Sequence, residues 1–370
     1  FIHQIVSKKY NKIYMPRTWA VGNSNWGANT ERYNAVIDKV KAFDNIIFSV
    51  KNTRTDFWRY NLFNPVIGTG DKEQAMEFLC QDGYNFKNSI PYYDVIRMAK
   101  GPKELGGQGG MKYGYKAGIR TAWGWLSADG WCGPYIKREE WLGANIYGFS
   151  RLTWDVDSDP LVLAKEWAAI EFEVESKSKV AEEIAKILML SEDLILKSRY
   201  FKNYSIKKEG WLPSNNWIRD ELIGGGTNSN DKLSVGKSFS PGTIKSIFNS
   251  ETIEEDILEK EEALAIMNTM LSKFADIKDQ IPEKEKAMEL YNTLIYGKYL
   301  IGTLRYYVSG MFRFYNGEYD KSVADLRMWK KYWDFYNNEI PKLPGTASLM
   351  LDGGMVDTCI EAMKFMNQSF

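Results

Sequence analysis

The sequence predicts an α/β protein: half of a (β/α)8 TIM barrel over residues 1–155, followed by an all-α helical domain over residues 156–370. In the first part, short apolar runs that favour β-structure alternate with helical periodicity, and the runs end in polar side chains, as in parallel barrels. In the second part, apolar residues recur at helical spacing almost without interruption. With 370 residues, of which 44% are hydrophobic, the chain can bury a large core.

The clearest predicted strand covers residues 45–51, and it ends abruptly at Lys51 and Asn52, with Asp56 shortly after. The carboxyl ends of barrel strands and the loops that follow them carry the chemistry of this fold. Asp56 is therefore a candidate catalytic carboxylate. The alternative is a turn-forming or helix-capping Asp, which is common after a strand.

On the N-terminal side of this strand, residues 12–22 favour another strand that contains Arg17, although Pro16 argues against a fully hydrogen-bonded position. Asn29 or Thr30 can cap a helix that runs to about Phe43. Strand, helix and strand in this order are typical of a parallel sheet.

On the C-terminal side, strands are expected at residues 74–81 and 119–126, with a short helix at 91–100 between them. The glycine-rich stretch 101–118 lacks the Gly-Lys-Ser/Thr ending of a phosphate loop, and no helix is expected to follow it. We therefore predict a flexible connection there.

From residue 139 onward the pattern is helical, apart from a loop-rich stretch. Helices are expected at 139–153, from Asp159-Pro160 to Ile170, and at 176–203. Residues 205–250 are loop-rich. Most of 250–370 is expected to be helical, with breaks at Pro282, Gly317 and Pro341–Pro344.

About four β/α units make only half of an eight-stranded barrel, which would expose two strand edges and an unfilled interior. We therefore expect either a further N-terminal part or a second chain that supplies the remaining strands. The alternative is a small open α/β sheet.

Composition excludes several classes of function. Lys+Arg and Asp+Glu are both 48, so no net charge favours nucleic acid or an anionic membrane. No apolar run is long enough to span a bilayer. The single histidine, His3, argues against a histidine triad or a His-rich metal site, and the three distant cysteines indicate free thiols. Proton transfers would fall to carboxylates, Lys or Tyr.

Three stretches resemble glycoside hydrolase family 67, the α-glucuronidases. Residues 47–57 look like the family's strand ending in Lys-Asn-Gly-Pro-x-Asp-Phe, and residues 74–84 look like its Gln-Met-Met-Glu-Phe-Gln strand. Residues 144–154, Ala-Asn-Ile-Tyr-Gly-Phe-Ser-Arg-Leu-Thr-Trp, are similar to Ala-Asn-Leu-Tyr-Gly-Phe-Gly-Arg-Leu-Ala-Trp. The resemblance covers about residues 10–215 and is looser beyond them.

The resemblance implies a (β/α)8 barrel with a C-terminal helical domain, of which this chain is the C-terminal half of the TIM barrel plus the helical domain. It also implies removal of (4-O-methyl-)glucuronic acid from xylan-derived oligosaccharides with inversion, without a metal or other cofactor. Asp56 matches the family's general base, and Lys51 lies in the same matching strand and is taken as substrate-binding. Arg17 matches an Arg that binds the uronate carboxylate, with a structural ion pair as the alternative reading. Trp131 matches a Trp of the sugar pocket, with an ordinary packing Trp as the alternative.

The sequence departs from the family at its second carboxylate, where Gly83 precedes Tyr84. Asp82 is the neighbouring candidate, but strand alternation points it to the opposite face unless a bulge redirects it. Glu77 shares the face of Gly83 yet lies deeper in the strand. Thr53-Arg54-Thr55 also replace the Gly-Pro pair before the catalytic Asp. The general acid is expected upstream of Phe1.

Two classes of function follow. The first is a hydrolase acting on an oligosaccharide with a uronic acid. The second is a carbohydrate-binding or assembly protein on a degenerate barrel, which Gly83 and the aromatic-rich helical domain favour. We expect a homodimer or a second chain that completes the barrel. The compartment is left open, with the cytoplasm favoured over others, and the Lys, Glu, Ile and Tyr content hints at a thermophilic source.

Overall fold

The computed structural model describes residues 2–18, 26–40, 45–54, 57, 59, 62–80, 85–126, 136–207, 241–347 and 354–370. By its internal contacts the chain divides into two compact units. The first unit comprises Phe1–Cys80, Asp94–Leu126 and Asn145–Pro160, and the second comprises Gln81–Tyr93, Ser127–Ala144 and Leu161–Phe370. The first contains a parallel sheet with helices, and the second is helical. The predicted domain boundary after residue 155 stays a prediction.

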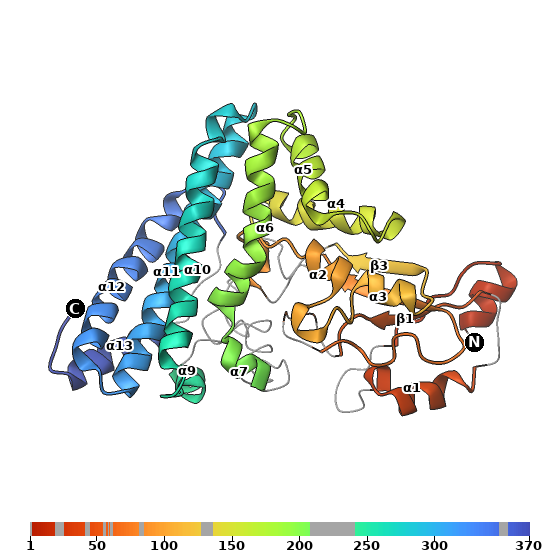
Figure 1. The fold of residues 1–370 in the computed structure, drawn as a ribbon, viewed down its shortest axis with the longest axis horizontal. Helices are drawn as coiled ribbons and strands as arrows, with labels where there is room; N and C mark the ends of the chain where they lie inside the picture. Colours follow the sequence, from red (N-terminus) through yellow and green to blue (C-terminus); the bar gives the residue numbers. More distant parts are fainter. Residues whose placement is uncertain are drawn as a thin grey trace. The chain divides into compact units, whose positions relative to one another are not determined.

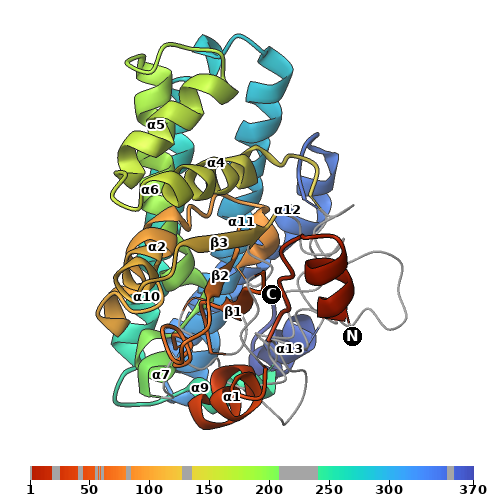
Figure 2. The ribbon, with the colours of Figure 1, turned by 90° about the vertical axis from the view of Figure 1, so that its right-hand side faces the viewer.

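The first unit is built on three parallel strands, β1 (Phe48–Lys51), β2 (Gln74–Leu79) and β3 (Thr121–Trp125), which lie side by side in chain order (Figure 2). Phe48 pairs with Gln74 and Ala75 with Thr121. On the other side of β1, single parallel bridges join Tyr14 to Ile46 and Arg17 to Ser49. The predicted strand at 12–22 is thus reduced to two bridges among its described residues, because Pro16 lacks the N–H that a continuous ladder needs.

Alternation along the strands gives the sheet two chemically different faces. The apolar face carries Val50, Met76 and Phe78, all buried, and Phe78 contacts Phe149 of α4 (Glu140–Trp154) with ring centroids 5.9 Å apart. The polar face carries Ser49, Lys51, Glu77, Trp123 and Trp125. The register places Lys51, Glu77 and Trp123 in one row across the three strands.

Helix α1 (Thr30–Ile37) begins as predicted, since the Asn29 side chain accepts a 2.9 Å hydrogen bond from the N–H of Arg32. It ends at Ile37 rather than near Phe43. Between β2 and β3 lie η3 (Phe86–Asn88) and α2 (Val95–Lys100), the latter inside the predicted range 91–100.

The prediction of a flexible connection at 101–118 is wrong. This stretch contains η4 (Lys103–Leu105) and α3 (Met111–Lys116), so a helix does follow the glycine cluster. Tertiary packing stabilises it: a Cβ at Gly114 would lie 2.1 Å from the sulfur of Met76, so this glycine lets α3 lie directly on the apolar face of the sheet. A six-residue helix has too little periodicity to be detected from sequence.

Helices of different lengths form the second unit (Figure 1). They are α5 (Pro160–Glu171), α6 (Lys179–Arg199), α7 (Lys202–Lys207), α9 (Pro241–Ile247), α10 (Ile253–Ala275), η6 (Lys278–Gln280), α11 (Lys284–Tyr315), α12 (Tyr319–Asn338), η7 (Ile340–Lys342) and α13 (Gly354–Phe365). Helix α11 packs between α10 and α12, and α6 packs on α10. The predicted breaks are confirmed, because Pro282 separates α10 from α11 and Gly317, with φ +78°, separates α11 from α12.

Helix α6 begins after Ser178, whose side chain accepts a 3.2 Å hydrogen bond from the N–H of Ala181. The stretch 205–250, expected to be loop-rich, includes the end of α7 and all of α9, while residues 208–240 lie outside the described part. Within the described part, no helix is both long and apolar enough to cross a bilayer.

Candidate functional site

Of the residues singled out from the sequence, the structure describes Arg17, Lys51 and Glu77, whereas Asp56, Asp82 and Trp131 lie outside the described residues. Arg17 stands beside β1, Lys51 is the last residue of β1, and Glu77 lies in β2. All three belong to the first unit. The polar face of the sheet is therefore where the predicted site residues can be tested against geometry.

Arg17 and Glu77 form a bidentate ion pair. The Nε of Arg17 donates to Oε2 of Glu77 at 2.7 Å, and its Nη2 donates to Oε1 at 2.6 Å. The Glu77 side chain is fully buried, and 35% of the Arg17 side chain is exposed. Paired N–H groups facing both carboxylate oxygens fix the orientation of the guanidinium as well as its position. The ion pair considered as the alternative reading for Arg17 is present, and a uronate-binding role stays a prediction.

Two indole groups of β3 complete this cluster. The Nε1 of Trp125 donates to Oε1 of Glu77 at 2.9 Å, and the Nε1 of Trp123 donates to Oγ of Ser49 at 2.7 Å. The Ser49 hydroxyl lies 3.5 Å from Oε2 of Glu77. The Arg17 guanidinium carbon is 5.2 Å from the ring centroid of Trp125, within range of a cation–π contact. We call Arg17, Ser49, Glu77, Trp123 and Trp125 the Arg17–Glu77 cluster.

The cluster combines a cation, a buried carboxylate and two half-buried indole rings whose centroids are 5.2 Å apart. Aromatic faces of this kind suit the C–H surfaces of sugars, and a guanidinium suits a carboxylate. The sequence reasoning missed Trp123 and Trp125 as partners. The signal was present, because two Trp at alternate positions of one strand share a face.

At the carboxyl end of β1, several polar groups are buried. Lys51 is 4% exposed, and its Nζ lies 4.5 Å from the ring centroid of Phe57. Oδ1 of Asn52 and Oγ1 of Thr53 are buried without a hydrogen-bond partner among the described residues. Buried polar atoms without a hydrogen-bond partner are costly, so each of them calls for an explanation. They mark the exit of β1 as the polar end of the sheet.

The residues directly after β1 are paired with residues 62–64. Thr53 and Phe63 form an antiparallel bridge, and the N–H of Arg54 donates to the carbonyl of Leu62 at 2.8 Å. The N–H of Asn64 donates to the carbonyl of Asn52 at 3.2 Å. These contacts join the chain directly after β1 to residues 62–64.

The Cys80 thiol lies directly after β2. Burial, and secondarily the Asp94 carboxylate, raise the pKa of the Cys80 thiol to about 12, so Cys80 is protonated at neutral pH. The described residues include no cluster of three His, Cys, Asp or Glu side chains arranged to hold a metal ion.

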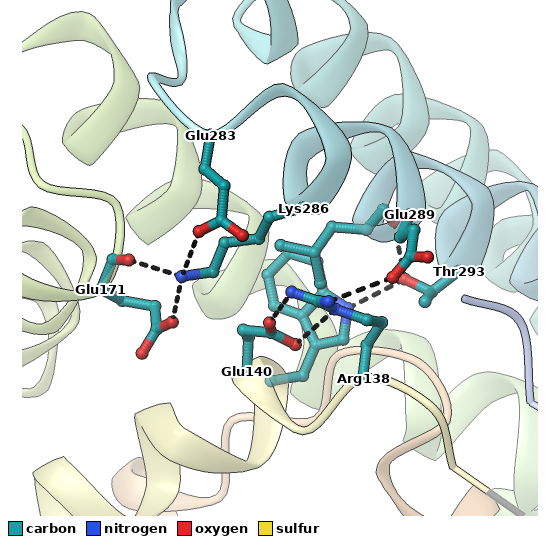
Figure 3. Close-up of polar contacts among 9 residues, drawn as sticks. Arg138, Glu140, Glu171, Glu283, Lys286, Glu289 and Thr293 are labelled. Atoms are coloured by element: carbon teal, nitrogen blue, oxygen red, sulfur yellow. Dashed lines mark hydrogen bonds and ion pairs between the residues drawn. The ribbon is translucent and has the colours of Figure 1, made fainter. Parts of the chain in front are cut away.

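In the second unit, the start of α4 is tied to α11 by a set of polar contacts (Figure 3). Arg138 pairs with Glu140 and, at 3.0 Å, with Glu289 of α11. The buried Trp141 donates from its Nε1 to Oγ1 of Thr293 at 3.0 Å. These contacts fix where α4 begins.

A second set of contacts ties the end of α5 to the same helix (Figure 3). Nζ of Lys286 in α11 donates to the carbonyl of Glu171 at 2.9 Å and pairs with its carboxylate at 2.7 Å. Glu283 approaches the same ammonium at 3.7 Å. Helix α11 therefore serves as a common support for α4 and α5.

Residues 139–208 match a family model described as "Glycosyl hydrolase family 67 C-terminus". The matched segment runs from the start of α4 to just past α7. A comparison with curated proteins gave no match. The matched segment contains Ala144–Trp154, one of the three stretches on which the resemblance rests. The resemblance of this chain to glycosyl hydrolase family 67 is therefore confirmed, through its segment 139–208.

Proposed function

We propose that this chain takes part in α-glucuronidase-type glycoside hydrolysis, the removal of a (4-O-methyl-)glucuronic acid from xylan-type oligosaccharides by an inverting acid/base mechanism. The observation that carries the proposal is the family match at residues 139–208. The polar face of the sheet supports it independently, since it holds a guanidinium beside two indole rings.

The Arg17–Glu77 ion pair is compatible with uronate binding. A guanidinium carries five N–H donors, and Glu77 engages the Nε and Nη2 edge of Arg17. The other edge, formed by Nη1 and the second N–H of Nη2, can still donate two parallel hydrogen bonds to the carboxylate of a substrate. Glu77 would then orient Arg17 for the substrate, and Trp125 would limit its freedom from the ring side.

In the proposed mechanism Asp56 acts as the general base. An inverting enzyme needs one carboxylate to activate water on one face of the sugar and an acid on the other, about 6.5–9.5 Å away. Asp82 is the candidate second carboxylate, and Lys51 and Trp131 are proposed substrate contacts. The general acid would come from a further part of the protein or from another chain.

We also propose that β1, β2 and β3, with the bridged segment at Tyr14 and Arg17, form part of a barrel wall. Parallel strands that neighbour each other in chain order support this, because a TIM barrel is wound in that way. The polar face would then be the interior of the barrel, and its carboxyl end would be the active-site end.

The proposal is tested with Asp56→Asn and Arg17→Ala in the native protein. Asp56→Asn is expected to abolish turnover of an aryl glucuronide while binding of glucuronic acid is largely retained. Arg17→Ala is expected to lose the preference for uronic over neutral sugars. Near-normal rates for Asp56→Asn would remove the base assignment, and an unchanged sugar preference would remove Arg17 from the site.

A second candidate is a carbohydrate-binding protein without hydrolytic activity. Two observations favour it: Gly83 stands where the family has its second carboxylate, and both oxygens of Glu77 are engaged by Arg17 and Trp125. Glucuronide binding without turnover in the native protein, with its intact mass and partners determined under non-denaturing conditions, would establish this candidate.

A further inference from the structure

A buried asparagine of α4 connects two separate parts of the first unit. Nδ2 of Asn145 donates to the carbonyl of Cys80 at 3.1 Å, and its Oδ1 accepts from the N–H of Asp94 at 2.8 Å. Cys80 is the residue after β2, and Asp94 directly precedes α2. The Asn145 side chain is completely buried. One amide thus joins the exit of β2 to the start of α2.

The chain of hydrogen bonds continues from Asp94 to the exit of β1. Nε of Arg97 donates to Oδ1 of Asp94 at 2.7 Å, and Nη2 of Arg97 bonds to the other carboxylate oxygen. Nη1 of the same guanidinium lies 3.4 Å from the carbonyl oxygen of Phe57. Asp94 and Arg97 are 1% and 4% exposed. The whole path from Cys80 to Phe57 is therefore shielded from water.

Close helix packing sets the geometry of this path. Gly148 lies one turn after Asn145 on the same side of α4. A Cβ on Gly148 would lie 2.4 Å from Cγ2 of Val95, the neighbour of Asp94. Only glycine allows α4 to approach α2 so closely, and this approach brings the Asn145 amide within reach of the Asp94 N–H.

The two ends of this hydrogen-bonded path, Phe57 and Cys80, lie close in the chain to the two candidate carboxylates. Phe57 follows Asp56 directly in the chain, and Cys80 precedes Asp82 by two residues. We propose that Asn145, Asp94 and Arg97 are positioning residues that hold the exits of β1 and β2 in a fixed relation, and with them the chain that carries the two candidate carboxylates. In its catalytic consequence this inference rests on the proposed function.

The chemistry of the path argues for positioning over stability. Buried ion pairs add little stability compared with apolar residues of the same volume, because desolvation offsets their attraction. They do fix orientation. A guanidinium that bonds both oxygens of a carboxylate, and an amide that bonds through both its N–H and its oxygen, fit their partners in only one arrangement. Catalytic groups must be held within about 0.5 Å, which needs supporting groups whose own orientation is locked.

The first test measures the two strand exits without reference to activity. Amide hydrogen exchange is followed by mass spectrometry in peptides that cover residues 52–64 and 78–86. We expect Asn145→Ala to raise exchange about tenfold in both peptides and Arg97→Lys to raise it mainly in 52–64, because local opening becomes easier. If Asn145→Ala does not fold, Asp94→Asn replaces it, since it keeps the shape and removes the charge.

Gln74→Met is the matched control. Gln74 is also buried and bonds to Tyr33, Val66 and Gly68, but it lies at the opposite end of β2. The Gln74→Met substitution is expected to lower overall stability and to leave amide hydrogen exchange in peptides 52–64 and 78–86 unchanged relative to the rest of the sheet. Equal exchange in these two peptides for the parent, Arg97→Lys and Asn145→Ala (or Asp94→Asn in its place) would overturn the inference.

The second test separates the inference from the proposed function. With an aryl glucuronide, we expect Arg97→Lys and Asn145→Ala to lower kcat about tenfold or more while KM changes little, because alignment and not binding is affected. If the parent protein does not hydrolyse the substrate, the proposed function fails, whereas the exchange result still decides whether the path holds the strand exits. A change confined to KM would count against positioning.

Discussion

Arg17 and Glu77 meet above β1, although they are 60 residues apart in the chain. Arg17 lies beside β1 next to Ser49, and Glu77 lies in β2 next to Lys51. The ion pair therefore crosses over β1, and the small Ser49 side chain beneath it leaves the space that the guanidinium needs. Ser49 is 1% exposed and receives the Trp123 indole N–H, so it is both spacer and hydrogen-bond partner.

This arrangement makes Ser49 a sensitive position. Ser49→Leu is expected to separate Arg17 from Glu77 and to leave a buried carboxylate without its cation, at a cost of about 3 kcal/mol in the free energy of unfolding. Ser49→Ala keeps the space and removes only the hydroxyl, with a loss of about 1 kcal/mol. Urea denaturation measures both. Equal losses for Leu and Ala would show that Ser49 does not act as a spacer.

The fork between Arg17 and Glu77 predicts that lysine cannot replace arginine. Arg17→Lys keeps the charge, but one ammonium cannot bond both carboxylate oxygens and lie against Trp125 at the same time. We expect a loss of about 1–2 kcal/mol in the free energy of unfolding. Arg32→Lys on the exposed side of α1 is the control, with a change within about 0.5 kcal/mol. Similar values for the two substitutions would mean that the fork contributes nothing.

The buried thiols are expected to be inert. With the pKa of Cys80 raised to about 12 by burial, only about 10⁻⁴ of it is thiolate at pH 8. Burial also raises the pKa of Cys359 well above its ordinary value. Peptide mapping after alkylation is expected to find both cysteines unmodified in native buffer and both modified in urea. Native alkylation of Cys80 at the denatured rate would contradict the burial of the exit of β2.

In the helical unit, Asp256 at the start of α10 introduces a pH dependence. Burial raises the pKa of its carboxyl above 3.8, although a 2.8 Å hydrogen bond from Thr252 and the Lys260 cation favour ionisation. A carboxyl with a raised folded-state pKa stabilises the fold below its ordinary pKa, and this stabilisation is lost as the pH rises through the folded value.

Asp256→Asn removes that titration. The difference in the free energy of unfolding, variant minus parent, is therefore expected to increase as the pH rises above 3.8. Denaturation curves between pH 4 and 7 measure it. Glu254→Gln, an exposed neighbour in the same turn of α10, is the control and is expected to show little change. A flat difference for Asp256→Asn would contradict the assigned burial.

Local patterns predicted the elements of this fold well. The apolar run before Lys51 became β1, Asn29 capped a helix, and Pro282 and Gly317 separated the long helices. These signals are contained in a few neighbouring residues, because a turn, a cap or a two-residue alternation needs no knowledge of the rest of the chain. The short helix α3 was not predicted, because it depends on the close contact between Gly114 and Met76, which are far apart in the sequence.

The candidate site was harder to predict because it depends on register. From the sequence, Glu77 lies deeper in its strand than the position of the family's second carboxylate, and nothing in its own strand reveals that Arg17 lies across β1 from it. The pairing of parallel strands is set by the whole packed sheet and not by the residues of one strand. The family resemblance correctly drew attention to the stretch Ala144–Trp154, but it gave no reason for Asn145, which only the contacts with Cys80 and Asp94 provide.

The strand pairings also imply an order of folding events. Phe48 must find Gln74, and Ala75 must find Thr121, across long intervening segments, whereas α11 and α12 are joined by a turn at Asn316–Glu318. Closing long loops delays contact formation, so chains rich in local contacts fold faster. We therefore expect the helical hairpin to form first and the sheet last, which leaves the strands open to wrong partners for longest while the chain is being made.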